Sequence, residues 1–311
     1  MTDSNFEKYL VKEPIRKGRS DKDVRNRTFP PMTYMSDDQV AGIKYNVEFG
    51  WVWGMPDPNP FLHERVGSYD EILLHIGGDH RNPEDLGADI EYSLGGQVMS
   101  INSTGAVYIP RGLRHGPLRY KEFRHPHMRV SILLGTGRRP EAAETVSPSL
   151  ESENGVNAVV DYEKYLVKKP AYEVVPEFPV ANRQGPSSMT LMSKNLVPEC
   201  NIYIECGWVW GMPDPNPHIF EHNHGFEELV LHCGADHEHP EDLGGEIEFS
   251  VGGQPLKVDK TSMVFVPQSV SHGPLVWKAY RFPHLEMAII PGASTLDDAD
   301  PGGHREKMRT R

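Results

Sequence analysis

The sequence predicts an all-β protein built of two tandem β-barrels that arose by internal duplication. The stretch GWVWGMPDPNP at 50–60 recurs letter for letter at 207–217. At the same offset, PEDLGADIEYSLGGQ at 83–97 corresponds to PEDLGGEIEFSVGGQ at 240–254. A period of this length is too long for a solenoid repeat, so it indicates two copies of a whole domain.

Within each copy, short runs rich in β-branched and aromatic residues alternate with glycine and proline. A Gly-Gly pair separates two such runs in IEYSLGGQVMSI and again in IEFSVGGQPLKV. Both central residues of a type I′ turn need positive φ, so the pair predicts a β-hairpin in each copy. PEDLG, with proline first and glycine last, is compatible with one helical turn. Many short strands without a long helical stripe predict sandwiches or barrels.

The chain of 311 residues is long enough for two domains with separate cores. We expect an N-terminal barrel at 1–138, a linker at 139–155, a C-terminal barrel at 156–292 and a polar tail at 293–311. The linker region, GRRPEAAETVSPSLESENG, is rich in Glu, Ser and Pro and has no apolar period.

Composition excludes several classes of function. The formal net charge of −12 and the lack of a basic face argue against nucleic acid as a partner. No apolar stretch approaches the ~20 residues that span a bilayer, and the first residues do not form a secretory signal. Three cysteines do not resemble a disulfide framework, so the cytoplasm is the expected compartment. We expect a small-molecule substrate and no membrane partner; assembly into a homo-oligomer is left open.

The second copy contains a cluster of metal-ligand residues, in HNHGFEELVLHCG and VPQSVSHGPL. His222 and His224 are two residues apart, so on a strand both imidazoles point to the same face. Glu228 returns on the next strand, and His272 follows a later one. Three imidazoles and one carboxylate suit one divalent transition metal per chain, with iron, manganese, nickel, zinc and copper as alternatives.

These residues resemble the motifs of the cupin superfamily. Its first motif, His-x-His followed by Glu, is matched within 222–228. Its second, Pro-x-Gly-x-x-His, is matched by Pro267 and His272, although Ser269 stands where glycine is usual. The glycine that opens the first motif and the asparagine that closes the second are absent. The resemblance implies two cupin-type, jelly-roll barrels, a bicupin, with His222, His224, Glu228 and His272 as metal ligands.

The first copy has lost part of this set. The residues at the corresponding positions are Arg65, Gly67, Glu71 and His115. Two of the four ligands are therefore missing, and an arginine cannot replace one. We expect a degenerate site in a barrel that serves as a scaffold or in assembly, with Arg65 and Glu71 paired where the metal would be.

Two Asp-His pairs, Asp79-His80 and Asp236-His237, occur in both copies and so do not follow the predicted metal site. We favour a structural role, such as capping the PEDLG turn, over a second metal site. His232 follows Glu228 by four residues and so shares its strand face. It is read either as a hydrogen-bond partner of the site or as a core histidine.

The paired tryptophans of the GWVWG element are read as core or subunit-interface residues, with a substrate wall in the second barrel as the alternative. They are Trp51, Trp53, Trp208 and Trp210.

The resemblance implies a metal-dependent enzyme acting on a small oxygenated substrate, aromatic or dicarbonyl in some bicupins. An iron-dependent dioxygenase, an oxidoreductase, is the leading hypothesis. A redox-neutral decarboxylase, lyase or isomerase and a non-catalytic small-molecule-binding barrel are the alternatives. Catalytic residues are not assigned; the candidates to orient a substrate are Gln268, Arg281 and His284, which lie in or just after the His272 strand.

Overall fold

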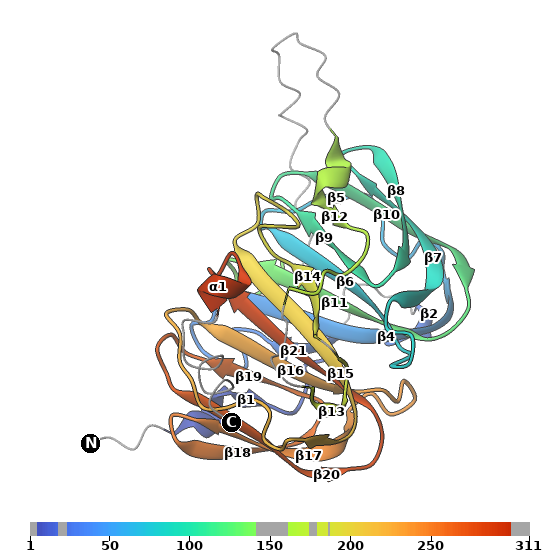
Figure 1. Cartoon of the computed structure of the whole chain (residues 1–311). Coiled ribbons are helices and arrows are strands. Elements are labelled where there is room, and N and C mark those ends of the chain that lie inside the picture. Colours follow the sequence, from blue (N-terminus) through green and yellow to red (C-terminus); the bar gives the residue numbers. More distant parts are fainter. Residues whose placement is uncertain (1–4, 18–23, 141–160, 174–178, 186, 300–311) are drawn as a thin grey trace. The chain divides into compact units, whose positions relative to one another are not determined.

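The computed structural model describes residues 5–17, 24–140, 161–173, 179–185 and 187–299 (Figure 1). They form two compact units. The first barrel comprises Arg16–Gly77 and Glu84–Lys168, and the second barrel comprises Met1–Ile15, Gly78–Pro83 and Lys169–Arg311. Each unit is built of antiparallel β-sheets, which confirms the predicted all-β duplication.

The first barrel packs a seven-stranded sheet against a four-stranded sheet. The order in the larger sheet is β12 (Leu166–Val167), β9 (Gly105–Ile109), β6 (Glu71–Gly77), β11 (His127–Leu134), β4 (Tyr45–Asp57) and β2 (Arg25–Arg27), with β3 (Met32–Met35) also paired to β4. The order in the smaller sheet is β5 (Arg65–Val66), β10 (Arg114–Phe123), β7 (Asp85–Leu94) and β8 (Gln97–Ser103). A 3-10 helix, η2 (Tyr162–Tyr165), precedes β12.

The second barrel repeats this plan. Its larger sheet has the order β1 (Leu10–Val11), β19 (Ser262–Val266), β16 (Glu228–Gly234), β21 (His284–Pro291), β15 (Ile202–Asp214) and β13 (Ala181–Arg183), with β14 (Met189–Met192) also paired to β15. Its smaller sheet has the order β18 (Gln254–Lys260), β17 (Asp242–Val251) and β20 (His272–Tyr280). Two short helices, η1 (Phe6–Tyr9) and α1 (Leu296–Ala299), complete it.

The Gly-Gly hairpins form as predicted. In β7–β8, Leu94 pairs with Gln97, and the intervening Gly95 and Gly96 have φ of 59° and 86°. Two left-handed residues in succession are what a type I′ turn requires, and glycine adopts them without strain. The corresponding glycines of β17–β18 have φ of 57° and 79°.

The predicted helical turn at PEDLG does not form. Asp85 is already the first residue of β7 and pairs with Ser103 of β8, and its copy Asp242 pairs with Lys260. A helical turn at this place would break the pairing of these residues with the neighbouring strand. The proline and the acids therefore belong to a turn that leads into a strand.

The barrels depart from the predicted boundaries in their terminal arms. β1 lies in the second barrel, where Leu10 pairs with Val264, and β12 lies in the first, where Leu166 pairs with Val107 (Figure 1). Each arm thus completes the sheet of the barrel formed mainly by the other copy. The arms have nearly the same sequence, FEKYLVK and YEKYLVK, so sequence pattern cannot distinguish the two pairings.

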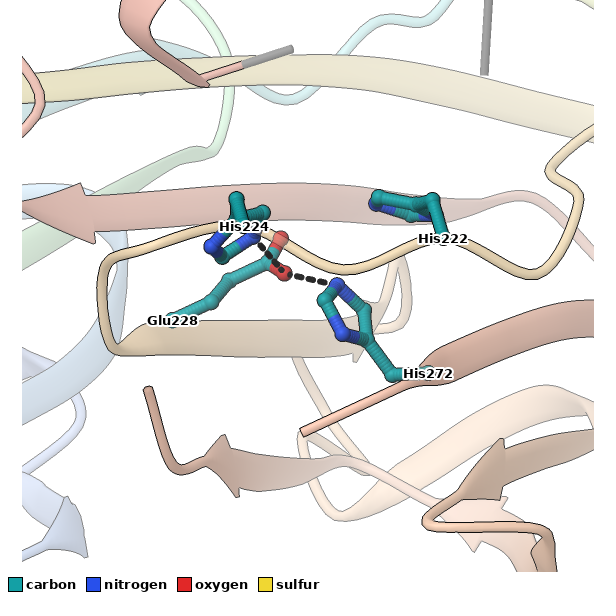
Figure 2. A group of neighbouring side chains, drawn as sticks. All are labelled: His222, His224, Glu228 and His272. Carbon is teal, nitrogen blue, oxygen red and sulfur yellow. Dashed lines mark hydrogen bonds and ion pairs between the residues drawn. The ribbon is translucent and has the colours of Figure 1, made fainter. Parts of the chain in front are cut away.

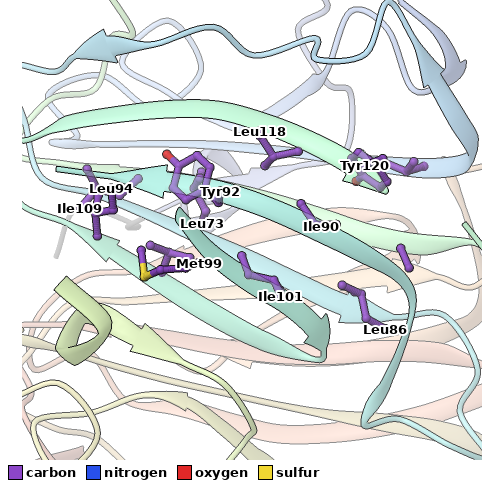
Figure 3. Close-up of a cluster of buried hydrophobic side chains, with 13 residues drawn as sticks. Leu73, Leu86, Ile90, Tyr92, Leu94, Met99, Ile101, Ile109, Leu118 and Tyr120 are labelled. Atoms are coloured by element: carbon purple, nitrogen blue, oxygen red, sulfur yellow. The ribbon is translucent and has the colours of Figure 1, made fainter. Parts of the chain in front are cut away.

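An apolar cluster fills the space between the two sheets of the first barrel (Figure 3). Leu73 of β6 and Val52 of β4 contribute from the larger sheet, and Tyr92 and Tyr120 from the smaller. Because side chains alternate along a strand, the residues two apart from Leu73 and Val52 also face this interior. We call this interior the lumen of the barrel.

Two predicted polar segments are more ordered than expected. Arg139, assigned to the linker, has a side chain only 9% exposed. In the predicted tail, Ala293 and Ala299 are buried and α1 forms. The remainder of both predictions, at 141–155 and 300–311, lies outside the described residues.

The three cysteines, Cys200, Cys206 and Cys233, are buried and free of disulfides, as expected. No helix among the described residues is long and apolar enough to cross a membrane.

Candidate metal centre

The structure brings the four predicted ligand residues of the second barrel together (Figure 2). Glu228 is the first residue of β16 and His272 the first of β20. His222 and His224 lie in the loop before β16 rather than on a regular strand. His222 is held by a two-way backbone bridge to His272, with N···O distances of 2.9 and 2.8 Å.

In each of the three imidazoles, a backbone carbonyl lies within hydrogen-bonding distance of Nδ1 and orients the ring. The Nδ1 atoms of His222, His224 and His272 lie 2.8, 3.0 and 2.9 Å from the carbonyl oxygens of Phe220, Phe226 and Val270, respectively. A carbonyl can only accept, so Nδ1 carries the proton in each ring. In the neutral imidazole, this leaves the Nε2 lone pair available as a metal ligand.

Glu228 supplies the negative charge at the centre. Its Oε2 lies 2.8 Å from His272 Nε2 and 3.3 Å from His224 Nε2. Burial by itself raises the pKa of Glu228, but the adjacent imidazoles of His224 and His272 outweigh burial and bring the pKa well below its ordinary value. Burial and the neighbouring His272 lower the pKa of His222 to about 4, so that imidazole is neutral at physiological pH.

The geometry fits one small divalent ion. All four ligand atoms lie within 4.8 Å of one another. Two ligands on opposite sides of a metal, each ~2.1 Å from it, are about 4 Å apart. Three residues of the set, His224, Glu228 and His272, are at most 7% exposed. Burying three imidazoles and a carboxylate together costs free energy unless a shared cation binds to them. Among the described residues, no other His, Cys, Asp and Glu group of this kind meets the spacing of a metal site.

Ser269, which stands where the second motif usually has glycine, adopts a backbone conformation that favours glycine. Its φ is 62°, in the left-handed region, and its N–H donates to the carbonyl of His224 at 2.9 Å. The corresponding residue in the first barrel is Gly112, with φ of 79°. The loop of the motif is therefore preserved with serine, at some cost in backbone strain.

In the first barrel, ion pairs occupy the corresponding place, as predicted. Arg65 lies 2.8 Å from Oε2 of Glu71, and His115 Nε2 lies 3.7 Å from the same oxygen. Arg139, which was not predicted, lies 3.1 Å from Oε1 of Glu71 and 3.1 Å from Glu48. The carboxylate that would bind a metal is thus neutralised by two arginines.

The three candidate substrate-orienting residues lie in different environments. Gln268 is exposed in the turn between β19 and β20 and makes none of the hydrogen bonds of the cluster. Arg281 is exposed and forms an ion pair with Asp242, which gives it a structural role. His284 is fully buried, and its Nε2 lies 2.9 Å from the indole nitrogen of Trp277. His232 is also fully buried, but neither of its ring nitrogens has a hydrogen-bond partner, so it makes no hydrogen bond to Glu228.

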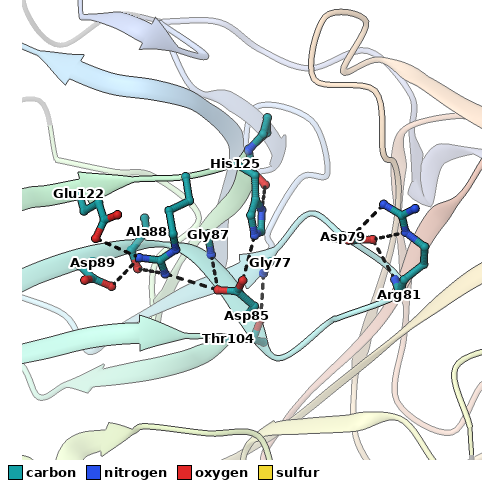
Figure 4. Close-up of polar contacts among 12 residues, drawn as sticks. Gly77, Asp79, Arg81, Asp85, Gly87, Ala88, Asp89, Thr104, Glu122 and His125 are labelled. Atoms are coloured by element: carbon teal, nitrogen blue, oxygen red, sulfur yellow. Dashed lines mark hydrogen bonds and ion pairs between the residues drawn. The ribbon is translucent and has the colours of Figure 1, made fainter.

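The Asp-His pairs serve their loops. Asp79 Oδ1 accepts hydrogen bonds from the backbone and side chain of Arg81, at 3.0 and 2.9 Å (Figure 4). Asp236 accepts from the backbone N–H of Glu238 at 2.9 Å. An Asp side chain that bonds two residues ahead is a common turn device. The neighbouring Asp85 likewise accepts from Gly87 and lies 3.2 Å from Nε2 of His125 (Figure 4).

The tryptophans do not line the lumen. On β15 the lumen face carries Glu205, Gly207 and Val209, because Val209 belongs to the apolar cluster of that interior. Trp208 and Trp210 alternate with these residues and face the other way. Trp208 is fully buried, and both rings lie beside His80, with ring centroids 6.4 and 5.8 Å away. The substrate-wall hypothesis is therefore wrong. Trp51 and Trp208 are core residues, whereas Trp53 is 37% exposed.

A second polar group in the same lumen was missed from the sequence. Arg183 and His218 lie 3.6 and 3.7 Å from Oε2 of Glu286 on β21. Glu205 faces the same interior, and its pKa is influenced by Arg183, Glu286 and Glu228. Aligning the copies would have drawn attention to two of these residues, because His218 replaces Phe61 and Glu286 replaces Arg129.

Comparison with known proteins supports the fold. No family model and no curated protein sequence matches the chain. Among solved structures, the 7S globulin of Momordica charantia aligns with a TM-score of 0.53 and 10% identity, over 92% of this chain and 84% of that one. An oxalate decarboxylase of Bacillus subtilis aligns with a TM-score of 0.51 and 10% identity, over 91% and 78% of the two chains.

A further structure of the oxalate decarboxylase, described for its Mn(II) centres, aligns with a TM-score of 0.50 and 11% identity, over 85% of this chain and 73% of that one. These similar proteins are bicupins. The chain therefore has the same duplicated β-barrel fold as these structures. At these identities the likeness defines the fold and leaves the activity to be argued from the site.

Proposed function

We propose that the protein is a metal-dependent enzyme whose single centre, in the second barrel, acts on a small oxygenated substrate. The observation that carries the proposal is that the four residues bring one ligand atom each within 4.8 Å of one another, while a backbone carbonyl lies at the Nδ1 atom of every imidazole. The four residues would hold one divalent ion. The chemistry supplied by such an ion is the polarisation and positioning of substrate oxygens and, for iron, the activation of dioxygen.

The remaining polar residues of this lumen would bind and orient the substrate. Arg183 and His218 offer hydrogen-bond donors, and Glu286 and Glu205 offer carboxylates. Both nitrogens of His218 and Oε2 of Glu286 are buried without a hydrogen-bond partner. Buried polar atoms of this kind gain most from a ligand that completes their hydrogen bonds. The expected substrate therefore carries hydroxyl or carbonyl groups in addition to those that reach the metal.

A dioxygenase is our leading hypothesis for the reaction, and the test is whether iron at this centre keeps an exchangeable position. The metal is removed, ferrous iron is added under argon, and nitric oxide is supplied as a surrogate for dioxygen. We expect the half-integer-spin resonance of an iron–nitrosyl centre. The matched control is the variant in which both His222 and His224 are alanine, which should give no signal.

A fully iron-loaded protein that gives no nitrosyl signal would exclude the dioxygenase. A positive result is followed by measuring oxygen consumption with catechols, diketones and hydroxy acids. Turnover that needs the metal, with or without oxygen, separates an enzyme from a binding protein.

Redox-neutral chemistry is the second candidate, and Glu205 is the observation that favours it. This carboxyl faces the lumen beside the proposed centre and accepts a hydrogen bond from the Tyr203 hydroxyl at 3.0 Å. A positioned carboxyl is a suitable proton donor or acceptor for a decarboxylase, lyase or isomerase. For that reaction class, Glu205→Gln should lower turnover without lowering metal content, whereas a change confined to substrate affinity would leave Glu205 a binding group.

The metal itself is proposed as iron, with manganese as the first alternative because a protein of the same fold has Mn(II) centres. We retain the cytoplasm as the proposed compartment and a small molecule as the proposed partner.

A further inference from the structure

Arg129 is a cation inside the first barrel without an anionic partner. On β11 it pairs with His75 of β6 and with Gly50 of β4. His75 is two residues from Leu73 and Gly50 two residues from Val52, so the side chain of Arg129 faces the apolar lumen. Its Nε is buried without a hydrogen-bond partner, and the side chain forms no hydrogen bond or ion pair with a described residue.

The charges around Arg129 do not compensate it. The two carboxylates on this face of the sheet, Glu71 and Glu48, are already paired with Arg65 and Arg139. Both carboxylates thus already have cationic partners, and the guanidinium of Arg129 forms no ion pair with either. Burial lowers the pKa of Arg129, and the nearby Glu71 offsets this only in part. Arg129 is half-buried, and a charge that is partly removed from water without an ionic partner is destabilising.

In the second barrel, the charge at the corresponding position has partners of opposite charge. Glu286 stands at the position of Arg129, and it lies between Arg183 and His218. The first barrel keeps an arginine at the position of Arg183, namely Arg27, which lies 4.4 Å from the ring of Phe61. The duplication has therefore exchanged the carboxylate of a buried ion pair for a second cation.

Neutral hydrogen-bond donors surround the guanidinium. Arg129 acts electrostatically on both Tyr92 and His75, which places these groups near it. The Tyr92 hydroxyl makes no hydrogen bond with a described residue, and neither ring nitrogen of His75 has a partner. Tyr92 lies among the apolar side chains of the lumen (Figure 3). Together they form an anion site: one charge, further donors and an apolar wall.

We propose that the lumen of the first barrel binds a small monocarboxylate, paired with the guanidinium of Arg129 and hydrogen-bonded by Tyr92 and His75. A carboxylate would supply the negative charge that Arg129 lacks. A planar carboxylate also matches the two-pronged donor geometry of arginine. The first barrel is then a second, metal-independent ligand site, and this role does not depend on the reaction proposed for the second barrel.

The test uses the full-length chain with His222 and His224 both changed to alanine, so that carboxylate cannot bind through a metal. Acetate and benzoate are titrated by calorimetry, with chloride and inorganic phosphate as comparison anions. We expect one carboxylate per chain. Changing Arg129→Met in this background should weaken binding at least about tenfold, the effect of losing a charge-assisted pair. Arg129→Lys should retain part of the affinity, because it keeps the charge and loses the planar geometry.

Arg124→Met is the matched control, since Arg124 is an arginine of the same barrel that pairs with Asp85 and Asp89 at the surface. It should leave carboxylate affinity unchanged. Without ligand, the Arg129→Met chain should unfold at a higher temperature than its parent, because a buried unpaired charge has been removed. Absence of carboxylate binding, tighter binding of phosphate, equal affinity in the Arg129→Met chain, or a lower unfolding temperature for that variant would each overturn the proposal.

Discussion

The two barrels place the same buried carboxylate in two different surroundings. Glu228 begins β16 and lies against His224 and His272, whereas Glu71 begins β6 and lies against Arg65 and Arg139. In either barrel the carboxylate needs positive charge nearby, because a bare anion in the interior is costly. A metal ion would provide it in one copy, and arginine provides it in the other. Loss of a metal site after duplication therefore need not leave a cavity; it can leave an ion pair.

The largest effect on stability is expected when this carboxylate is neutralised in the first barrel. Glu71→Gln leaves Arg65 and Arg139 near each other without their shared anion, and removal of one partner of a buried pair costs about 3–5 kcal/mol. In metal-free protein, Glu228→Gln should cost much less, because its neighbours are imidazoles that can become neutral. Urea unfolding of both variants measures the difference. Equal losses would mean that the two carboxylates are not in different electrostatic environments.

A second contrast concerns Glu205 and its counterpart Glu48. Burial raises the pKa of Glu205 to about 7, only partly offset by Arg183. A raised folded-state pKa means that Glu205 stabilises the fold in its protonated form, and that this stability is lost as the pH rises through about 7. At about pH 8, metal-free Glu205→Gln protein should therefore be more stable than the parent by roughly 1–3 kcal/mol.

Glu48→Gln is the control for that comparison. Glu48 pairs with Arg139 at 3.1 Å, so its amide variant should be less stable than the parent at the same pH. Unfolding free energies between about pH 5 and pH 8 decide the matter. If the unfolding free energies of both variants change in the same direction relative to the parent, the charge balance assigned to the two lumens is incorrect.

The exchange of terminal arms predicts a smaller effect on stability, in which a change in one arm weakens the barrel formed mainly by the other copy. Phe6 packs against the core of the second barrel and Tyr162 against that of the first. Phe6→Ala should cost about 1–2 kcal/mol and reduce amide protection in β18 and β19, although it lies in the first half of the sequence. Tyr162→Ala should act on β8 and β9. Hydrogen exchange that follows sequence halves instead would contradict the arm assignment.

The smallest expected effect is at the loop beneath the ligands. Ser269→Gly removes the left-handed strain at φ of 62° and should stabilise the fold by about 1 kcal/mol. Gly112→Ala in the first barrel should cost a similar amount, and no atom lies within 4 Å of the added carbon, so strain alone is measured. Thermal unfolding of the two variants should show shifts of opposite sign.

The features that depend on local pattern were accessible from the sequence. The offset between copies predicted the hairpins, and the His-x-His, Glu and His spacing selected the four residues that the fold brings together. The same offset predicted the pairing of Arg65 with Glu71. Each of these inferences uses periodicity or alignment alone.

The features that depend on contacts across the barrels were not accessible. Arg139 lies in a polar segment that reads as a linker, and only the fold directs it to Glu71 and Glu48. The meeting of Arg183 and Glu286 requires β13 and β21 to flank β15, which no local pattern encodes. The arms have equivalent sequences, so their exchange is decided by topology rather than composition.

Metal content is the most direct test of the central claim, that one copy carries a metal centre and the other an ion pair. The untagged protein, His222→Ala/His224→Ala and His115→Ala are purified identically, and their metal is measured by elemental analysis. We expect one divalent transition metal per chain in the parent, none in the double variant and an unchanged content in His115→Ala, the first-barrel counterpart of His272. Two metals per chain, or retention of the metal by the double variant, would contradict it.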